Sequence, residues 1–102
     1  MNSQDVLMVR VYLAERGGQL EALLDFLHDE AGIRGWTVYR GISGYGSSGR
    51  VRTASLVDLS LDLPVTVEFF DTPSRVEAIL EQLVAFAGDG HVVSWPARAA
   101  SR

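Results

Sequence analysis

The chain has 102 residues, of which 47% are apolar and 22% charged, and it contains no cysteine. This composition fits one globular domain and excludes a disulfide scaffold, a thiolate metal site and a catalytic thiol. Nine arginines, no lysine and 13 acidic residues give a formal net charge of −4, which argues against a general nucleic-acid coat protein. Nothing at the N-terminus resembles a signal peptide and no stretch approaches about 20 apolar residues, so we expect a cytoplasmic protein without a membrane span.

Hydrophobic spacing places the first three elements. Residues of alternating character from Val6 to Leu13 predict a strand. Leucines then recur at helical spacing between Gln19 and Ala31, which predicts an amphipathic helix that ends at Gly32. The segment from Trp36 to Ile42 is rich in β-branched and aromatic residues and predicts a second strand.

The middle of the chain is less regular. Glycine, serine and arginine are frequent in residues 43–55, where we expect a flexible loop or a mobile hairpin tip. A weaker extended segment covers residues 51–61. Alternation from Val65 to Phe69 then predicts a third strand.

The last elements are marked by capping residues. A second helix is predicted to begin at Thr72-Pro73, with a hydroxyl at the N-cap and proline at the first helical position. The turn Gly88–Gly90 ends this helix, and residues 91–95 predict a short fourth strand. From about residue 97 we expect a short flexible tail.

The order β-α-β-β-α-β predicts an α+β, ferredoxin-like fold, in which two helices cover one face of a four-stranded antiparallel sheet. We expect residues 1–102 to form a single domain. The uncovered face of the sheet would be rich in apolar and aromatic side chains, and such a face usually packs against another subunit, so we expect an oligomer. The residues of this face are Met8, Tyr12, Thr37, Tyr39, Thr66 and Phe70.

Charge is segregated along the chain. Residues 31–57 contain four arginines and no acid, so this window carries a formal charge of +4 and the remainder −8. Glycine lets backbone N–H groups turn toward a ligand and guanidinium groups match phosphate or carboxylate oxygens, so the window suits a bound anion. The alternative is a solvated loop whose arginines pair with the protein's own acids. The four arginines are Arg34, Arg40, Arg50 and Arg52.

Several motifs occur in a characteristic order. The run from Ala31 to Gly46 contains glycine-isoleucine, glycine-x-threonine-valine, arginine-glycine and glycine-aromatic-glycine, and Asp62-Leu63-Pro64 precedes the third predicted strand. This progression, over about residues 6–95, resembles the PII-like family catalogued as domain of unknown function 190 (UPF0166 type). That family is related more distantly to the nitrogen-regulatory PII signalling proteins, so the resemblance implies a PII-like fold.

The resemblance to PII proteins implies a homo-trimer that binds ATP, ADP or AMP in clefts between subunits, without chemistry on the nucleotide. It implies one cleft wall formed by Thr37, Gly44, Tyr45 and Gly46, with Leu63 nearby. The adjoining wall would be a phosphate-holding turn in which a histidine replaces a lysine, formed by Gly88, Asp89, Gly90 and His91. The alternatives are a simple helix C-cap with a tight turn, and an exposed strand histidine.

Arginines supply further candidate ligand contacts. Arg50 and Arg52 flank the glycine-rich loop and are favoured to contact a phosphate or carboxylate. Arg40 lies in a predicted strand, where a structural salt bridge to Glu68 or Asp71 is an alternative to ligand contact.

The sequence also departs from the PII pattern. No tyrosine lies between Gly46 and Pro64 to accept a uridylyl group, so we do not expect that covalent signalling. The C-terminal tail is shorter, and the resemblance makes Arg98 and Arg102 the counterparts of the terminal arginines that contact phosphates in PII proteins.

We therefore expect a regulatory protein that senses a small anionic metabolite, preferably an adenine nucleotide, and orders residues 43–55 when the ligand neutralises Arg50 and Arg52. By resemblance, a membrane transporter, a channel or a metabolic enzyme is the expected partner, and nucleic acid is not. The alternative is an oligomeric protein–protein scaffold module that senses no small molecule. A phosphohydrolase is disfavoured because the chain has a single asparagine, Asn2, and no persuasive serine–histidine–acid set. We expect no metal site, no catalytic residue and no required cofactor.

Overall fold

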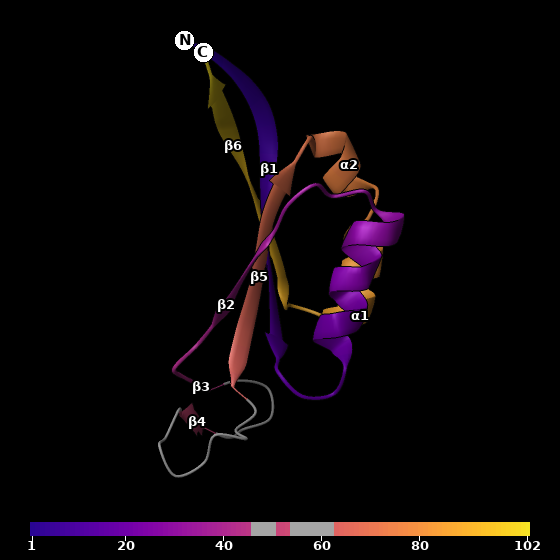
Figure 1. The fold of residues 1–102 in the computed structure, drawn as a ribbon, viewed down its shortest axis with the longest axis vertical. Helices are drawn as coiled ribbons and strands as arrows, with labels where there is room; N and C mark the ends of the chain where they lie inside the picture. Colours follow the sequence, from indigo (N-terminus) through magenta and orange to yellow (C-terminus); the bar gives the residue numbers. More distant parts are fainter. Residues whose placement is uncertain (46–50, 54–62) are drawn as a thin grey trace.

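A computed structural model describes residues 1–45, 51–53 and 63–102. Four strands form an antiparallel sheet in the order β2-β5-β1-β6, and the helices lie on one face of it (Figure 1). This arrangement confirms the α+β, ferredoxin-like fold. The strands are β1 (Asn2–Ala14), β2 (Thr37–Arg40), β5 (Pro64–Asp71) and β6 (Val92–Ser101), and the helices are α1 (Gln19–Asp25), α2 (Pro73–Glu77) and α3 (Leu80–Ala87).

The core lies between the sheet and the helices. Strand β1 pairs with β5 on one side and β6 on the other, so alternate β1 side chains point toward the helices. Val9 of β1 lies opposite Phe69 of β5, and Val11 lies opposite Val67. These side chains meet apolar side chains of the helices in one cluster, and its fully buried members are Val9, Val11, Leu23, Leu27, Val67, Val76 and Leu83.

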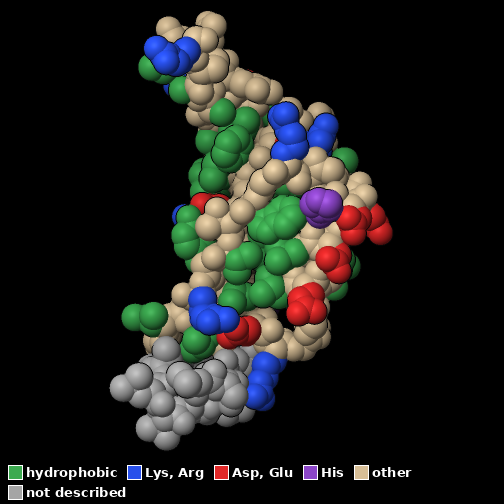
Figure 2. Space-filling view, viewed as in Figure 1, with side chains coloured by type: hydrophobic (Ala, Val, Ile, Leu, Met, Phe, Trp, Pro, Cys, Tyr) green, Lys and Arg blue, Asp and Glu red, His purple; other side chains and the backbone are tan. Residues whose placement is uncertain are grey.

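The first helix begins where its sequence predicts. Gly17 and Gly18 have φ angles of 103° and 80°, which a residue with a side chain rarely adopts, and they turn the chain from β1 into α1. The helix continues beyond Asp25 with one wider π turn, Phe26–Glu30, in which the N–H of Ala31 donates to the carbonyl of Phe26. Acidic side chains gather on the side of this first helix that faces away from the sheet (Figure 2).

The second predicted helix is divided in two. Thr72 caps α2 as expected, because its hydroxyl oxygen accepts a hydrogen bond from the N–H of Arg75 at 3.3 Å. The helix is interrupted at Ile79, whose φ of −115° departs from helical geometry, and α3 begins at the next residue. Ile79 remains buried, so the interruption keeps an apolar side chain in the core.

The predicted flexible tail is wrong. Strand β6 continues to Ser101 and pairs with the start of β1, with Asn2 opposite Ser101 and Asp5 opposite Arg98. Each terminal segment provides backbone hydrogen-bond partners for the other, although neither carries a strong strand signal. Pro96 is tolerated within the strand because β6 is an edge strand.

The glycine-rich segment contains paired strands. β3 (Ser43–Tyr45) and β4 (Val51–Thr53) form a two-stranded antiparallel sheet, with Gly44 opposite Arg52. This pairing favours the hairpin alternative over a plain loop for those residues. The remainder of the expected loop and of the extended segment 51–61 lies outside the described residues. Within the described part of the chain, no helix has the length and apolarity needed to cross a membrane.

Candidate functional site

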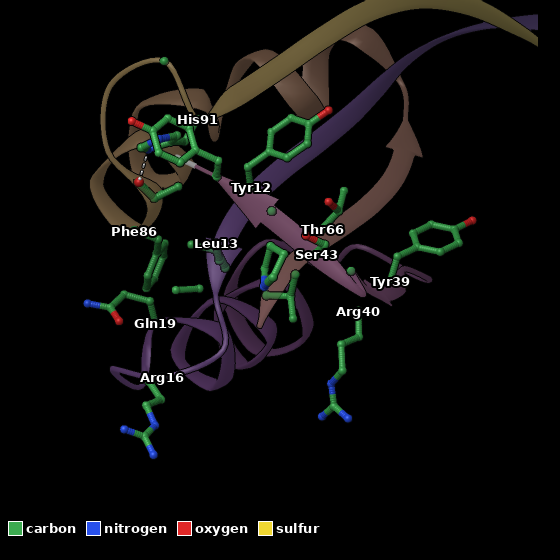
Figure 3. A pocket seen from close by; sticks show the side chains of 18 residues that line it. Tyr12, Leu13, Arg16, Gln19, Tyr39, Arg40, Ser43, Thr66, Phe86 and His91 are labelled. Atoms are coloured by element: carbon green, nitrogen blue, oxygen red, sulfur yellow. Dashed lines mark hydrogen bonds between the residues drawn. The ribbon is translucent and has the colours of Figure 1, made fainter. Parts of the chain in front are cut away.

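A cavity of about 730 Å³ lies at the end of the sheet, where β1 and β2 end, β5 begins and the chain enters β6 (Figure 3). Among the 18 described residues that line it, none is acidic. Its positively charged or protonatable side chains are Arg16, Arg40 and His91, and its aromatic side chains are Tyr12, Tyr39, Tyr45 and Phe86. This combination suits a ligand that carries both an anionic group and a flat ring.

Arg16 is a lining residue that the sequence analysis missed. It follows β1 and immediately precedes Gly17-Gly18, whose positive φ angles direct the turn into α1. Gln19 at the start of α1 lines the cavity as well. The sequence signal for it is an arginine between a strand and a glycine pair, outside the basic window of residues 31–57.

Close backbone packing forms the floor beside β3. The N–H of Gly41 donates to the carbonyl of Pro64 at 2.7 Å, and a Cβ placed on Gly41 would lie 2.8 Å from Cγ of Pro64. A Cβ on Gly44 would approach the same ring carbon equally closely. The close approach of Pro64 to the β2–β3 connection and to β3 therefore favours glycine at both positions.

His91 is held by the end of α3. Its Nδ1 lies 2.8 Å from the carbonyl oxygen of Ala87, which can only accept, so Nδ1 carries the hydrogen and Nε2 is the remaining ring nitrogen. Gly88 and Gly90 have φ angles of 95° and 81°, so the turn is a helix end that needs glycine, as the simpler interpretation stated. Gly90 and His91 also line the cavity, so the turn both ends α3 and contributes to the cavity wall.

Arg40 forms an ion pair with Glu15 through its Nη2. The structural salt bridge that was the alternative to ligand contact is present, but its acid is Glu15 in place of Glu68 or Asp71. Alternation along β2 places Arg40 and Tyr39 on opposite faces of the sheet, and Glu68 interacts with Tyr39 on the uncovered face. Asp71 lies at the far end of β5 and pairs with Arg75 at 3.6 Å.

The protein-family comparison agrees with this fold. The DUF190 family model, described as "Uncharacterized ACR, COG1993", matches residues 6–99. The chain belongs to the DUF190 family. It is 36% identical over 81 residues to the UPF0166 protein MJ1524 of Methanocaldococcus jannaschii, covering 74% of this chain and 73% of that protein. It is 39% identical over 54 residues to a UPF0166 protein of Aquifex aeolicus, covering 53% of this chain and 51% of that relative, so it spans about half of the latter's length.

The DUF190 chain also resembles a solved PII-like structure. This is CPII from Thiomonas intermedia K12, a nitrogen regulatory PII-like protein, in a structure with bound ADP, AMP and bicarbonate. The TM-score is 0.77 at 21% sequence identity, and the match covers 98% of this chain and 92% of CPII. At that identity the likeness shows that the two proteins share the PII-like fold.

The structure brings only some of the predicted site residues of this DUF190 protein together. Gly90, His91, Arg40, Gly44 and Tyr45 line the cavity. The half-buried Leu63 lies beside it, and its carbonyl accepts a hydrogen bond of 3.0 Å from the N–H of Glu15. Gly88 and Asp89 belong to the same turn as His91 without being lining residues.

The other predicted residues lie elsewhere in the fold or outside the described residues. Arg98 lies in β6 opposite Asp5. It is seven residues from His91, or about 23 Å along an extended strand. Arg52 lies in β4 opposite Gly44, whereas Gly46 and Arg50 are outside the described residues.

Thr37 lines a second cavity of about 620 Å³, together with Arg34 and Trp36. Glu68 and Asp71 line this cavity too, so its charge is mixed. An anion would be repelled by two carboxylates there, which makes the first cavity the stronger candidate for anion binding.

The uncovered face of the sheet carries exposed aromatic residues around a charged pair. Arg10 Nε donates to Glu68 Oε1 at 2.7 Å, which raises the pKa of Arg10 above its ordinary value, and the guanidinium lies 5.2 Å from the ring centre of Trp95. Tyr12, Phe70 and Tyr39 on this face are 42%, 51% and 53% exposed, respectively. The sequence prediction of an apolar uncovered face is therefore confirmed for these three residues.

Proposed function

We propose that this DUF190 protein is a PII-like regulatory protein, not an enzyme, whose main cavity binds an adenine nucleotide: ATP, ADP or AMP. One observation carries the proposal. The cavity combines Arg16, Arg40 and His91 with tyrosine rings, and no acid is found among its described lining residues. Guanidinium groups match phosphate oxygens, and aromatic side chains can stack on a flat base.

The comparison with CPII supports the choice of ligand. CPII has the same fold and a structure with bound ADP, AMP and bicarbonate. An adenine nucleotide contains both chemical parts that the cavity suits, a flat ring and a phosphate group. Bicarbonate has an anionic group but neither a phosphate nor an aromatic ring, so we rank it below the nucleotides for this cavity.

We further propose that the protein is a homo-trimer whose clefts lie between subunits. The support is the uncovered sheet face, where aromatic side chains remain about half exposed. Burial of such a face against other copies would be favourable, at roughly 25 cal/mol per Å² of apolar surface. Thr37 and Arg98 could then contribute to a cleft from a neighbouring subunit, although neither lines the main cavity within one chain.

The regulatory step in this proposal involves residues 43–55. Ligand phosphates would contact Arg50 and Arg52 and order residues 43–55. The ordered segment would then favour or block binding to a membrane transporter, a channel or a metabolic enzyme. Replacement of both arginines by glutamine is expected to abolish anion binding and to leave the fold intact. Unchanged affinity in that variant would remove the two arginines from the proposal.

A second candidate function is a protein–protein scaffold without small-molecule sensing. Ile42 and Tyr45 favour it, because they lie beside and within β3 and are 79% and 74% exposed. Large apolar side chains at such exposure are typical of protein contact surfaces.

Thermal unfolding with added ligands separates the two functions. A ligand present at 100 times its Kd stabilises the folded state by about 2.7 kcal/mol. We therefore expect ATP, ADP or AMP to raise the Tm by several degrees and adenosine to raise it far less. Absence of any shift with the three nucleotides would favour the scaffold, and release of phosphate during incubation would indicate an enzyme.

A further inference from the structure

The ion pair between Glu15 and Arg40 lies at the edge of the candidate cavity. Arg40 lines the cavity from the end of β2, and Glu15 is the residue that follows β1. The N–H of Glu15 donates to the carbonyl of Leu63 at 3.0 Å, so the backbone that carries this carboxylate is fixed to the start of β5. The carboxylate is therefore held close to a guanidinium that the cavity would otherwise present to a ligand.

This pair is only partly shielded from water. The Arg40 side chain is 64% exposed and that of Glu15 is 27% exposed. An exposed ion pair contributes up to about fivefold to an equilibrium constant. A nucleotide phosphate has more negative charge than one carboxylate and several acceptor oxygens, so it can replace Glu15 at Arg40.

We propose that Glu15 is an internal competitor that occupies Arg40 in the empty cavity and must be displaced by the anionic group of the ligand. This inference rests on the proposed function, because it requires that an anion enter the cavity. Glu15 then lowers the affinity for every ligand whose anion reaches Arg40. A ligand without an anionic group does not displace Glu15, so its affinity is unaffected.

The proposal gives Glu15 a role opposite to that of an ordinary lining residue. Removal of a group that contacts ligand weakens binding, whereas removal of a competitor strengthens it. After displacement, the Glu15 carboxylate also remains near the bound anion and repels it. Both effects have the same sign, so neutralisation of Glu15 is expected to increase anion affinity.

Titration calorimetry of the full chain with ADP tests this directly. We expect Glu15→Gln to bind ADP and inorganic pyrophosphate about two- to fivefold more tightly than the unmodified protein. Adenosine should bind both proteins with equal affinity. The matched control is Glu77→Gln. It makes the same change in net charge at an exposed position of α2, outside the cavity lining. Any gain shared by this control is a long-range effect of net charge.

A double-variant cycle assigns the effect to the pair. In an Arg40→Gln background only the repulsion by the Glu15 carboxylate remains, so Glu15→Gln should increase ADP affinity by a smaller factor than it does when Arg40 is present. Equal or weaker ADP binding by the single variant Glu15→Gln, relative to Glu77→Gln, would overturn the inference while leaving nucleotide binding in place.

Failure of the proposed function has a different result. If the unmodified protein does not bind ADP, the nucleotide proposal fails. The role of Glu15 is then tested by the affinity of the variants for pyrophosphate. Tighter pyrophosphate binding by Glu15→Gln than by Glu77→Gln would support the competitor, and equal binding or none would overturn it.

Discussion

Nδ1 of His91 donates a hydrogen bond to the carbonyl oxygen of Ala87, at a distance of 2.8 Å. Ala87 is the last residue of α3, so this bond also satisfies one of the carbonyls that a helix leaves unpaired at its end. The bond fixes which nitrogen carries hydrogen in the neutral ring, and Nε2 is then an acceptor. Protonation turns Nε2 into a donor without breaking the bond to Ala87, so the ring can change its preference for an anion while it keeps its position.

We predict that His91 makes anion binding stronger at lower pH. A protonated ring favours a phosphate more than a neutral ring does, so an anion that contacts His91 takes up a proton on binding and its affinity rises as the pH falls from 8 to 6. A terminal phosphate also protonates near pH 6, so the quantity to compare is the difference between the protein and His91→Gln.

Calorimetry at pH 8 and pH 6 measures that difference. His28→Gln is the matched control, because His28 is an exposed histidine that contacts Asp29 at 2.7 Å and does not line the cavity. If His91→Gln and the unmodified protein gain equally between the two pH values, His91 has no contact with the anion.

A second prediction concerns Arg16. Hydrogen bonds to charged groups contribute about 1.5–3 kcal/mol, so Arg16→Gln should weaken ADP binding by about tenfold or more if Arg16 contacts phosphate. Arg34→Gln makes the same change in charge at the second cavity and should cost little. Direct binding measurements on both variants locate the ligand, and a larger loss for Arg34→Gln would place it in the second cavity.

Local patterns predicted most of the fold. The spacing of Leu23 and Leu27 indicated the buried face of the first helix, and both side chains are fully buried. Alternation placed Val9 and Val11 toward the helices, which the structure confirms. These signals succeed because burial of one face imposes a fixed period on the sequence.

Non-local pairing was not predictable in the same way. The last strand extends through Ala97 and Ala100, small residues whose only strong reason to be extended is the partner segment Ser3 to Val6. The partner of Arg40 was also missed, because Glu15 is 25 residues away in sequence. The two residues meet only because β1 and β2 finish at the same end of the sheet. Ion pairs of this kind depend on how elements come together, and spacing within one element contains no information about that.

A third prediction tests the close packing beside β3. In Gly41→Ala the added Cβ would lie 2.8 Å from Cγ of Pro64, which can shift only by a change of ring pucker or by movement of the backbone. We expect a loss of about 1–3 kcal/mol in the free energy of unfolding, measured by denaturant titration. Gly35→Ala is the matched control, since a Cβ there meets nothing within 4 Å. Equal stability of the two variants would show that the Gly41–Pro64 contact relaxes without cost.

The last prediction concerns the uncovered face of the sheet. Phe70 is 51% exposed there, and Phe70→Glu would place a charge where another subunit is proposed to pack. Burial of an unpaired carboxylate costs several kcal/mol, so this variant should sediment as an 11.1 kDa monomer at micromolar concentration, whereas the unmodified protein should sediment as a larger species. Ala78→Glu adds the same charge at an exposed position between α2 and α3 and should leave the assembly unchanged.

Because Phe70 does not line the main cavity, its substitution separates assembly from the lining contacts of that cavity. A monomeric Phe70→Glu variant that still bound ADP with full affinity would show that one chain forms a complete site, and a monomeric unmodified protein would exclude the proposed trimer.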